Sequence, residues 1–225
     1  MSEDGACLPR AHARSSLVRI QPDIGYAASE AIDMVIMAMG TGPRFARYLV
    51  GSVTEKVLRF APCPVLVVER GDRDFVDPDT LAVTLERVVV ADDLSDKTMT
   101  ALSWAVERLR PYGPEIHMVH AVEFEVPTPY LMGGVRSVFT LDSSLSERVG
   151  GLLRDRASEA IPEEWTVVVD VREGRPLTVV PQYASEIGAD LLVVAGESHI
   201  DLGERVMGGT VERIARHAPC PMLVV

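Results

Sequence analysis

The chain has 225 residues, of which 47% are hydrophobic and 24% charged, a balance that is typical of a folded globular protein and excludes general disorder. The 33 acidic side chains outnumber the 22 basic ones, and the formal net charge of -11 argues against partners such as nucleic acid or an anionic membrane surface. The chain has three widely spaced cysteines, which do not indicate a disulfide framework. Its N-terminus has no apolar core, and no run approaches about 18 apolar residues, so the sequence predicts neither a signal peptide nor a membrane span. We therefore expect a cytoplasmic protein.

One segment of the chain occurs twice. Residues 33–68 align without a gap with residues 190–225, and 12 of the 36 aligned pairs are identical. About 105 residues of strand and helix pattern precede the second copy, whereas only 32 residues precede the first. We therefore predict an N-terminally truncated half-domain at 1–70, a linker rich in aspartate at 71–84 and a complete domain at 85–225.

Within the complete domain, strand patterns alternate with helix patterns. Ser95 offers a helix N-cap, Pro111 ends that helix, residues 123–140 are irregular and Gly188 closes a later helix. In chain order, the predicted strands are 88–91, 116–122, 166–171, 191–195 and 222–225. The helices are predicted from apolar stripes at 99–109, 141–153, 177–187 and 211–215.

This alternation predicts an α/β fold with a parallel sheet that helices cover on both faces. Ligands of such sheets bind beyond the carboxyl ends of the strands. The candidate positions are therefore 196–210, after the fourth strand, and Asp92 and Asp93, after the first. The two aspartates could hold a ribose or a metal ion, or they could form a solvated turn at the end of the strand.

The residues resemble the universal stress protein family. The resemblance covers 85–225 in full and 33–68 as the back half of a second copy, and it is most specific in the two endings, 55–68 and 212–225. It implies a five-stranded parallel sheet in the order 3-2-1-4-5, of the adenine nucleotide alpha hydrolase type. Many members of the family carry two such units in tandem.

ATP-binding members of the family have a phosphate loop of the form G-x2-G-x9-G-[ST] after strand four, whose glycines let backbone N–H groups approach the phosphates. The spacing here fits Gly196, Gly209 and Thr210, with His199 in place of the second glycine. An ungapped match to the first copy instead sets Gly208 and Gly209 at the end of the loop. Neither alignment is a clean match.

Two further residues carry over from the family. Asp93 matches the acidic residue that contacts the nucleoside, and Ala121 matches the small residue beside the adenine. Leu94 departs from the pattern because it replaces the usual glycine. The loop that would hold a triphosphate also contains three acidic residues, Glu197, Asp201 and Glu204. ATP is thus a candidate ligand, but no cofactor is required.

We find no nucleophile motif, no P-loop and no spacing of metal ligands, so the sequence predicts a protein that is not an enzyme and has no metal site. The leading hypothesis is a non-catalytic stress-response module that acts through dimerisation and through protein partners that the sequence does not identify. One alternative is an ATP-binding regulator with slow hydrolysis. Another is a regulatory piece of a longer chain, such as the tail of a transporter.

Strand five forms an apolar sheet edge in both copies, at 65–68 and 222–225. An exposed edge of this kind is an aggregation hazard unless it is covered or paired. In the universal stress proteins this strand pairs with its counterpart across a two-fold axis. We therefore expect either a homodimer or an internal pairing of the two copies. Apolar surface on the half-domain would then favour homodimerisation or the binding of a partner.

Overall fold

The computed structural model describes residues 32–38, 52–68, 75–77, 79–80, 82–124, 137–196 and 209–225. Its strands are β1 (Val35–Ala38), β2 (Val65–Val68), β3 (Arg87–Ala91), β4 (Glu115–Val122), β5 (Val167–Glu173), β6 (Leu191–Val194) and β7 (Met222–Val224). Its helices are α2 (Ser52–Phe60), α3 (Asp96–Leu109), α5 (Val138–Leu141), α6 (Leu145–Ala160), α7 (Pro176–Ile187) and α8 (Thr210–Ala215). No helix among these residues is long and apolar enough to cross a membrane.

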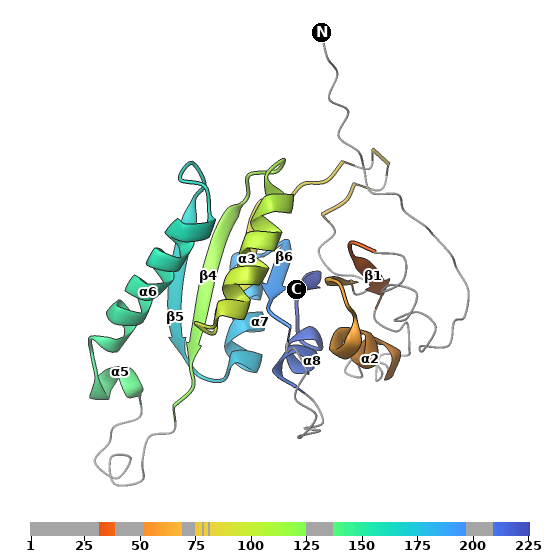
Figure 1. Ribbon diagram of the computed structural model, residues 1–225. Coiled ribbons are helices and arrows are strands. Elements are labelled where there is room, and N and C mark those ends of the chain that lie inside the picture. Colours follow the sequence, from red (N-terminus) through yellow and green to blue (C-terminus); the bar gives the residue numbers. More distant parts are fainter. Residues whose placement is uncertain are drawn as a thin grey trace.

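The strands form one sheet in the order β1-β2-β7-β6-β3-β4-β5 (Figure 1). The five strands of the complete domain are parallel and follow the predicted order 3-2-1-4-5, which is confirmed. The prediction of five strands was wrong for the sheet as a whole. The described part of the sheet has seven strands, because β1 and β2 of the first copy extend it beyond β7.

Alternate residues of each strand point to opposite faces of the sheet, and each face has its own core. On one face, Val90, Met118 and Val193 pack against α3 and α6. On the other, Val89 and Leu192 join the core that α7 and α8 cover. Figure 1 shows this layering, with α3 and α6 on one side of the sheet and α7 and α8 on the other.

The helix predicted from the stripe at 141–153 divides into two. Leu141 ends the short helix α5, and α6 begins only at Leu145. The intervening Asp142 forms a local turn, since its carboxylate accepts hydrogen bonds from the backbone and side chain of Ser144. Leu152, which we expected on the buried stripe, is 52% exposed.

The two copies of the repeat meet at β2 and β7, which lie antiparallel. Leu66 pairs with Leu223, Val65 with Val224 and Val67 with Met222. Because residues 65–67 are the repeat equivalents of 222–224, exchanging the two copies reproduces the same three pairs. The sheet therefore carries an approximate two-fold axis at the Leu66–Leu223 pair, like the isologous interface of a symmetric dimer.

The helices beside this axis also contact each other. The Arg59 guanidinium of α2 lies 3.3 Å from the carboxylate of Glu212 on α8, whose side chain is almost fully buried. The apolar face of α2 packs on its own strands through Val57, Val65 and Val67. The first copy is thus joined to the complete domain through both the sheet and the adjoining helix layer.

Candidate functional site

A cavity of about 220 Å³ lies where β3, β4 and β6 end, on the side of the sheet that α7 and α8 cover. This is the edge at which parallel sheets of this kind bind ligands. The lining is mainly apolar and consists of Ala91, Asp92, Asp93, Thr98, Val119, His120, Ala121, Pro176, Val180, Val194, Ala195, Thr210, Val211 and Ile214.

Four of the residues that the sequence predicts for the site line this cavity, namely Asp92, Asp93, Ala121 and Thr210. Asp93 follows β3, Ala121 is near the end of β4 and Thr210 begins α8, so the fold brings three distant segments together. Gly209 caps α8 next to Thr210 but is not part of the lining. His199 and Gly208 lie outside the described residues.

Gly196 contacts the end of β7 rather than the cavity. Its N–H donates to the carbonyl oxygen of Val225 at 2.7 Å. A Cβ at this position would lie 3.3 Å from the same oxygen, so little room exists for a side chain. Its neighbour Ala195 lines the cavity instead. In this structure Gly196 therefore serves close backbone packing between the ends of two strands.

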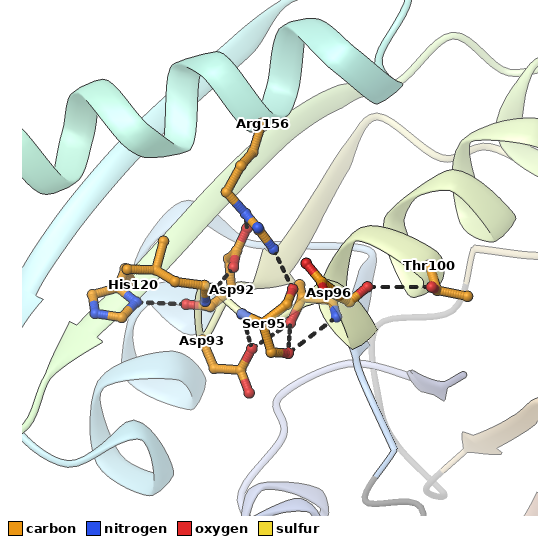
Figure 2. A network of polar contacts seen from close by, with 9 residues as sticks. Asp92, Asp93, Ser95, Asp96, Thr100, His120 and Arg156 are labelled. Atoms are coloured by element: carbon orange, nitrogen blue, oxygen red, sulfur yellow. Dashed lines mark hydrogen bonds and ion pairs between the residues drawn. The ribbon is translucent and has the colours of Figure 1, made fainter.

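Asp93 presents a fixed carboxylate to the cavity. Its Oδ1 accepts the backbone N–H of Ser95 at 2.9 Å and the hydroxyl of Thr98 at 2.7 Å. Partial burial acts to raise the pKa of Asp93, but the hydrogen bonds from Ser95 and Thr98 outweigh it, so the pKa lies below its ordinary value. Asp93 is thus ionised at neutral pH. Both of these bonds end on the same carboxylate oxygen, Oδ1 (Figure 2).

Asp92 has a different role from its neighbour. It is only 3% exposed, which rules out the solvated turn that we considered for it. Its Oδ2 accepts from Nε of Arg156 at 2.8 Å, and its Oδ1 accepts the backbone N–H of Leu94 at 2.6 Å. Figure 2 shows Arg156 reaching from α6 to this turn, where it also donates to the carbonyl oxygen of Ser95. Asp92 therefore holds the turn together.

The turn needs this support because Leu94 has a left-handed backbone, with φ at 65°. That conformation costs a residue with a Cβ about 1–2 kcal/mol, whereas a glycine adopts it without this cost. On its other side, the turn is held by Nδ1 of His120, which lies 2.7 Å from the carbonyl oxygen of Asp92. Strained turns that their surroundings hold in place are common at ligand sites.

Deeper along β4, a buried pair joins the strand to α7. The Nδ1 atom of His117 lies 2.7 Å from the hydroxyl of Tyr183, and its Nε2 lies 3.6 Å from a carboxylate oxygen of Glu115. The guanidinium group of Arg172 on β5 lies over the ring of Tyr183, 4.5 Å from its centroid. Val119 and Val180 line the cavity and belong to β4 and α7, the strand and helix that also carry His117 and Tyr183. The pair therefore lies beneath the site.

We expect His117 to make stability depend on pH. Burial lowers the pKa of His117 below its ordinary value of 6.5, although the nearby Glu115 carboxylate opposes this shift. The unfolded chain therefore takes up a proton near pH 6.5 that the folded chain accepts only at lower pH. Stability is fully present above that pH and falls as the pH drops below it.

The free energy of unfolding, measured by urea titration at about pH 8 and about pH 5.5, tests this expectation. The loss on acidification should be smaller in His117→Gln, which keeps a hydrogen-bonding group for Tyr183. An equal loss in the two proteins would assign the pH dependence to other groups.

Sequence reasoning missed Arg156, His120 and the α7 wall of the site. Arg156 follows Asp92 by 64 positions and belongs to another helix, so no local pattern connects the two. His120 could have been found, because it precedes Ala121 at the end of a predicted strand. Among the described residues, no group of three or more His, Cys, Asp or Glu side chains could hold a metal ion.

The chemistry of the site is that of a small binding pocket. The ionised Asp93 can accept hydrogen bonds from hydroxyl groups but cannot donate any. The apolar walls at Val119, Ala121 and Val180 suit a flat, weakly polar ring system. The cavity can therefore hold a ligand with an apolar ring at one end and hydroxyl groups near Asp93.

The chain matches the Universal stress protein family over residues 21–69 and 84–225. It is 25% identical over 142 residues to a universal stress protein of Methanocaldococcus jannaschii, covering 62% of this chain and 81% of that one. A universal stress protein of Mycobacterium tuberculosis is 28% identical over 198 residues, covering 87% of this chain and 62% of that one. The crystal structure of a universal stress protein from Archaeoglobus fulgidus superposes with a TM-score of 0.59 at 25% identity, covering 91% of this chain and 64% of the other.

Proposed function

Because the chain belongs to the universal stress protein family, we propose that it is a non-catalytic stress-response module of the cytosol that binds an adenine nucleoside and acts on a partner protein. The observation that carries this proposal is the meeting of Asp93, Ala121 and Thr210 around one cavity. These residues come from three separate segments of the chain, and the family resemblance implies a nucleotide-binding role for each of them.

The residues that line the cavity indicate which kind of ligand it would bind. An adenine ring would lie against Val119, Ala121 and Val180. The ribose hydroxyls would donate to Oδ2 of Asp93, the carboxylate oxygen that does not accept from Ser95 or Thr98. The volume of about 220 Å³ is below the range of about 300–1,000 Å³ that is typical of drug-sized ligands. This size favours recognition of the nucleoside portion over recognition of a whole triphosphate.

We infer that phosphates add little to the affinity. The loop that would hold them has His199 in place of a glycine, and it carries acidic residues at Glu197, Asp201 and Glu204. Like charges close to a phosphate oppose its binding. The chain would then sense a nucleoside or monophosphate, and hydrolysis of ATP would not be its function.

Calorimetry of the full chain with adenosine, AMP and Mg-ATP tests this function. We expect binding of adenosine, with ATP no tighter than adenosine, and an affinity at least about tenfold weaker in Asp93→Ala, equivalent to about 1.4 kcal/mol. Asp96→Ala is the matched control, because Asp96 is an exposed aspartate three residues away that does not line the cavity.

Two outcomes would contradict the proposal. A dissociation constant for Mg-ATP near 1 μM, about -8 kcal/mol, with adenosine far weaker, would favour the alternative of an ATP-binding regulator. Binding of adenosine that Asp93→Ala leaves unchanged would place the ligand outside this cavity.

A further inference from the structure

The short helix α8 contributes to two surfaces at once. Thr210, Val211 and Ile214 line the cavity, whereas Glu212 contacts α2 of the first copy through Arg59. Val211 and Ile214 also belong to the apolar core on this face of the sheet. Because α8 has only six residues, the position of this wall of the cavity depends on what holds Glu212 in place.

Glu212 is an acidic side chain that is removed from water. Its side chain is only 6% exposed, and the Arg59 guanidinium lies 3.3 Å from its carboxylate. The repeat equivalent in the first copy, Glu55, is 34% exposed. Burying a carboxylate is costly unless a cation compensates for the lost water. In the part of the chain that the structure describes, Arg59 is the cation within ion-pair distance of Glu212, so the burial of this carboxylate depends on the first copy.

Arg59 and its neighbour Leu58 both reach from α2 toward the second copy. Arg59 lies 3.8 Å from Glu55, one turn earlier on its own helix, but 3.3 Å from Glu212 on α8. Leu58 packs against the apolar core that contains Val211. Figure 1 shows α2 beside α8. The first copy thus holds this helix through a charge and through apolar packing.

We propose that Arg59 is a positioning residue for the nucleoside cavity and that the first copy thereby sets the affinity of this cavity. Arg59 does not line the cavity itself. It acts through Glu212, whose burial fixes α8 and with it Thr210, Val211 and Ile214. The identity of the ligand rests on the proposed function, whereas the position of α8 can be measured without any ligand.

Amide hydrogen exchange of the full chain measures how firmly α8 is held. The backbone N–H groups of Arg213 and Arg216 donate within this helix, and in Arg59→Leu we expect them to exchange at least about tenfold faster, because Glu212 loses its cation. Lys56→Leu is the matched control, since Lys56 is exposed on the same helix and its loss removes the same charge. Its exchange rates should stay within about twofold of the parent. The amides of β4 are the internal reference and should be unchanged in both variants.

Calorimetry with adenosine measures the effect on binding. Arg59→Leu should weaken the affinity about fivefold or more, and Lys56→Leu should leave it within about twofold. Adding Glu212→Gln to Arg59→Leu should restore part of the affinity, because the buried amide carries no charge that needs a cation. A residue that supports only the general stability of the fold would not give this recovery.

Unchanged exchange of α8 in Arg59→Leu would overturn the proposal, and so would equal acceleration of α8 and β4, which would indicate a general loss of stability. It would also be overturned by an adenosine affinity that Arg59→Leu leaves intact, or by further weakening when Glu212→Gln is added. A parent chain that binds no adenosine would instead contradict the proposed function. The exchange rates of α8 would then decide the role of Arg59 by themselves.

Discussion

Replacing Arg156 with leucine is expected to lower the free energy of unfolding by about 3–5 kcal/mol. The side chain of Asp92 is fully buried, and Arg156 is its cationic partner at 2.8 Å. Without Arg156, the carboxylate stays in the interior, and among the described residues the N–H of Leu94 is the remaining donor to its side-chain oxygens. The turn would also lose the donor to the carbonyl oxygen of Ser95, so Asp93 should lose its fixed position at the cavity.

Urea unfolding of the parent and of Arg156→Leu measures this effect, and Arg148→Leu is the matched control. Arg148 also belongs to α6 and pairs with an aspartate at 2.7 Å, but both of these side chains are largely exposed. Exposed pairs contribute little because water screens them. The double variant Asp92→Asn with Arg156→Leu should lose less than the sum of the single losses, because the two residues interact directly. Equal losses in Arg156→Leu and Arg148→Leu would show that the buried pair does not hold the turn.

Deleting residues 1–70 is expected to convert the remaining domain into a dimer that associates through β7. The deletion exposes an apolar edge formed by Met222, Leu223 and Val224. In the full chain, β7 pairs with β2 about an approximate two-fold axis at the Leu66–Leu223 pair. Two copies of β7 can pair with each other in the same antiparallel register. Light scattering of the shortened chain should give twice its monomer mass. At the same concentration, the full chain should not associate through this edge, because β2 covers it.

Introducing a charge at the centre of that register checks the geometry. Leu223→Asp in the shortened chain should return it to a monomer, because two carboxylates would face each other at the two-fold axis. Glu107→Asp is a suitable control, since Glu107 is exposed on α3, far along the chain from the edge. A shortened chain that is monomeric and as stable as the full chain would contradict a structural role for the β2–β7 pairing.

Much of the fold of the complete domain could be predicted, because its signals are local or repeated. Ser95 caps α3 by accepting the N–H of Thr98, and Gly188 ends α7 in a left-handed conformation, as the sequence indicates. The start of α6 was misplaced because Leu141 continues the apolar spacing of the helix although a turn at Asp142 interrupts it. For the apolar edges at 65–68 and 222–225, the sequence left open a homodimer or an internal pairing, and in the structure β2 pairs with β7 of the same chain. Periodicity alone does not distinguish the two, because the contact joins distant segments.

The place of the candidate site, at the carboxyl ends of the strands, could be predicted from the alternation of strands and helices. The family resemblance added Ala121. Asp93, Ala121 and Thr210 meet at the cavity because parallel strands end at one edge of the sheet. The different roles of the two neighbouring aspartates could not be predicted, since burial of Asp92 depends on Arg156 and on the left-handed turn at Leu94. Gly196 fits the spacing of the phosphate loop, but its surroundings are set by Val225, just beyond β7, and the loop spacing does not indicate this contact.

The pairing of β2 with β7 joins two halves that belong to one polypeptide, so dilution does not separate them. In a dimer of two chains, the paired fraction falls as the protein becomes scarce, because association depends on concentration. Here the residues between β2 and β3 tether the halves, and a tether of this kind sets an effective concentration on the order of millimolar. The paired sheet therefore forms at the same free energy whether a cell holds a few copies of the protein or many.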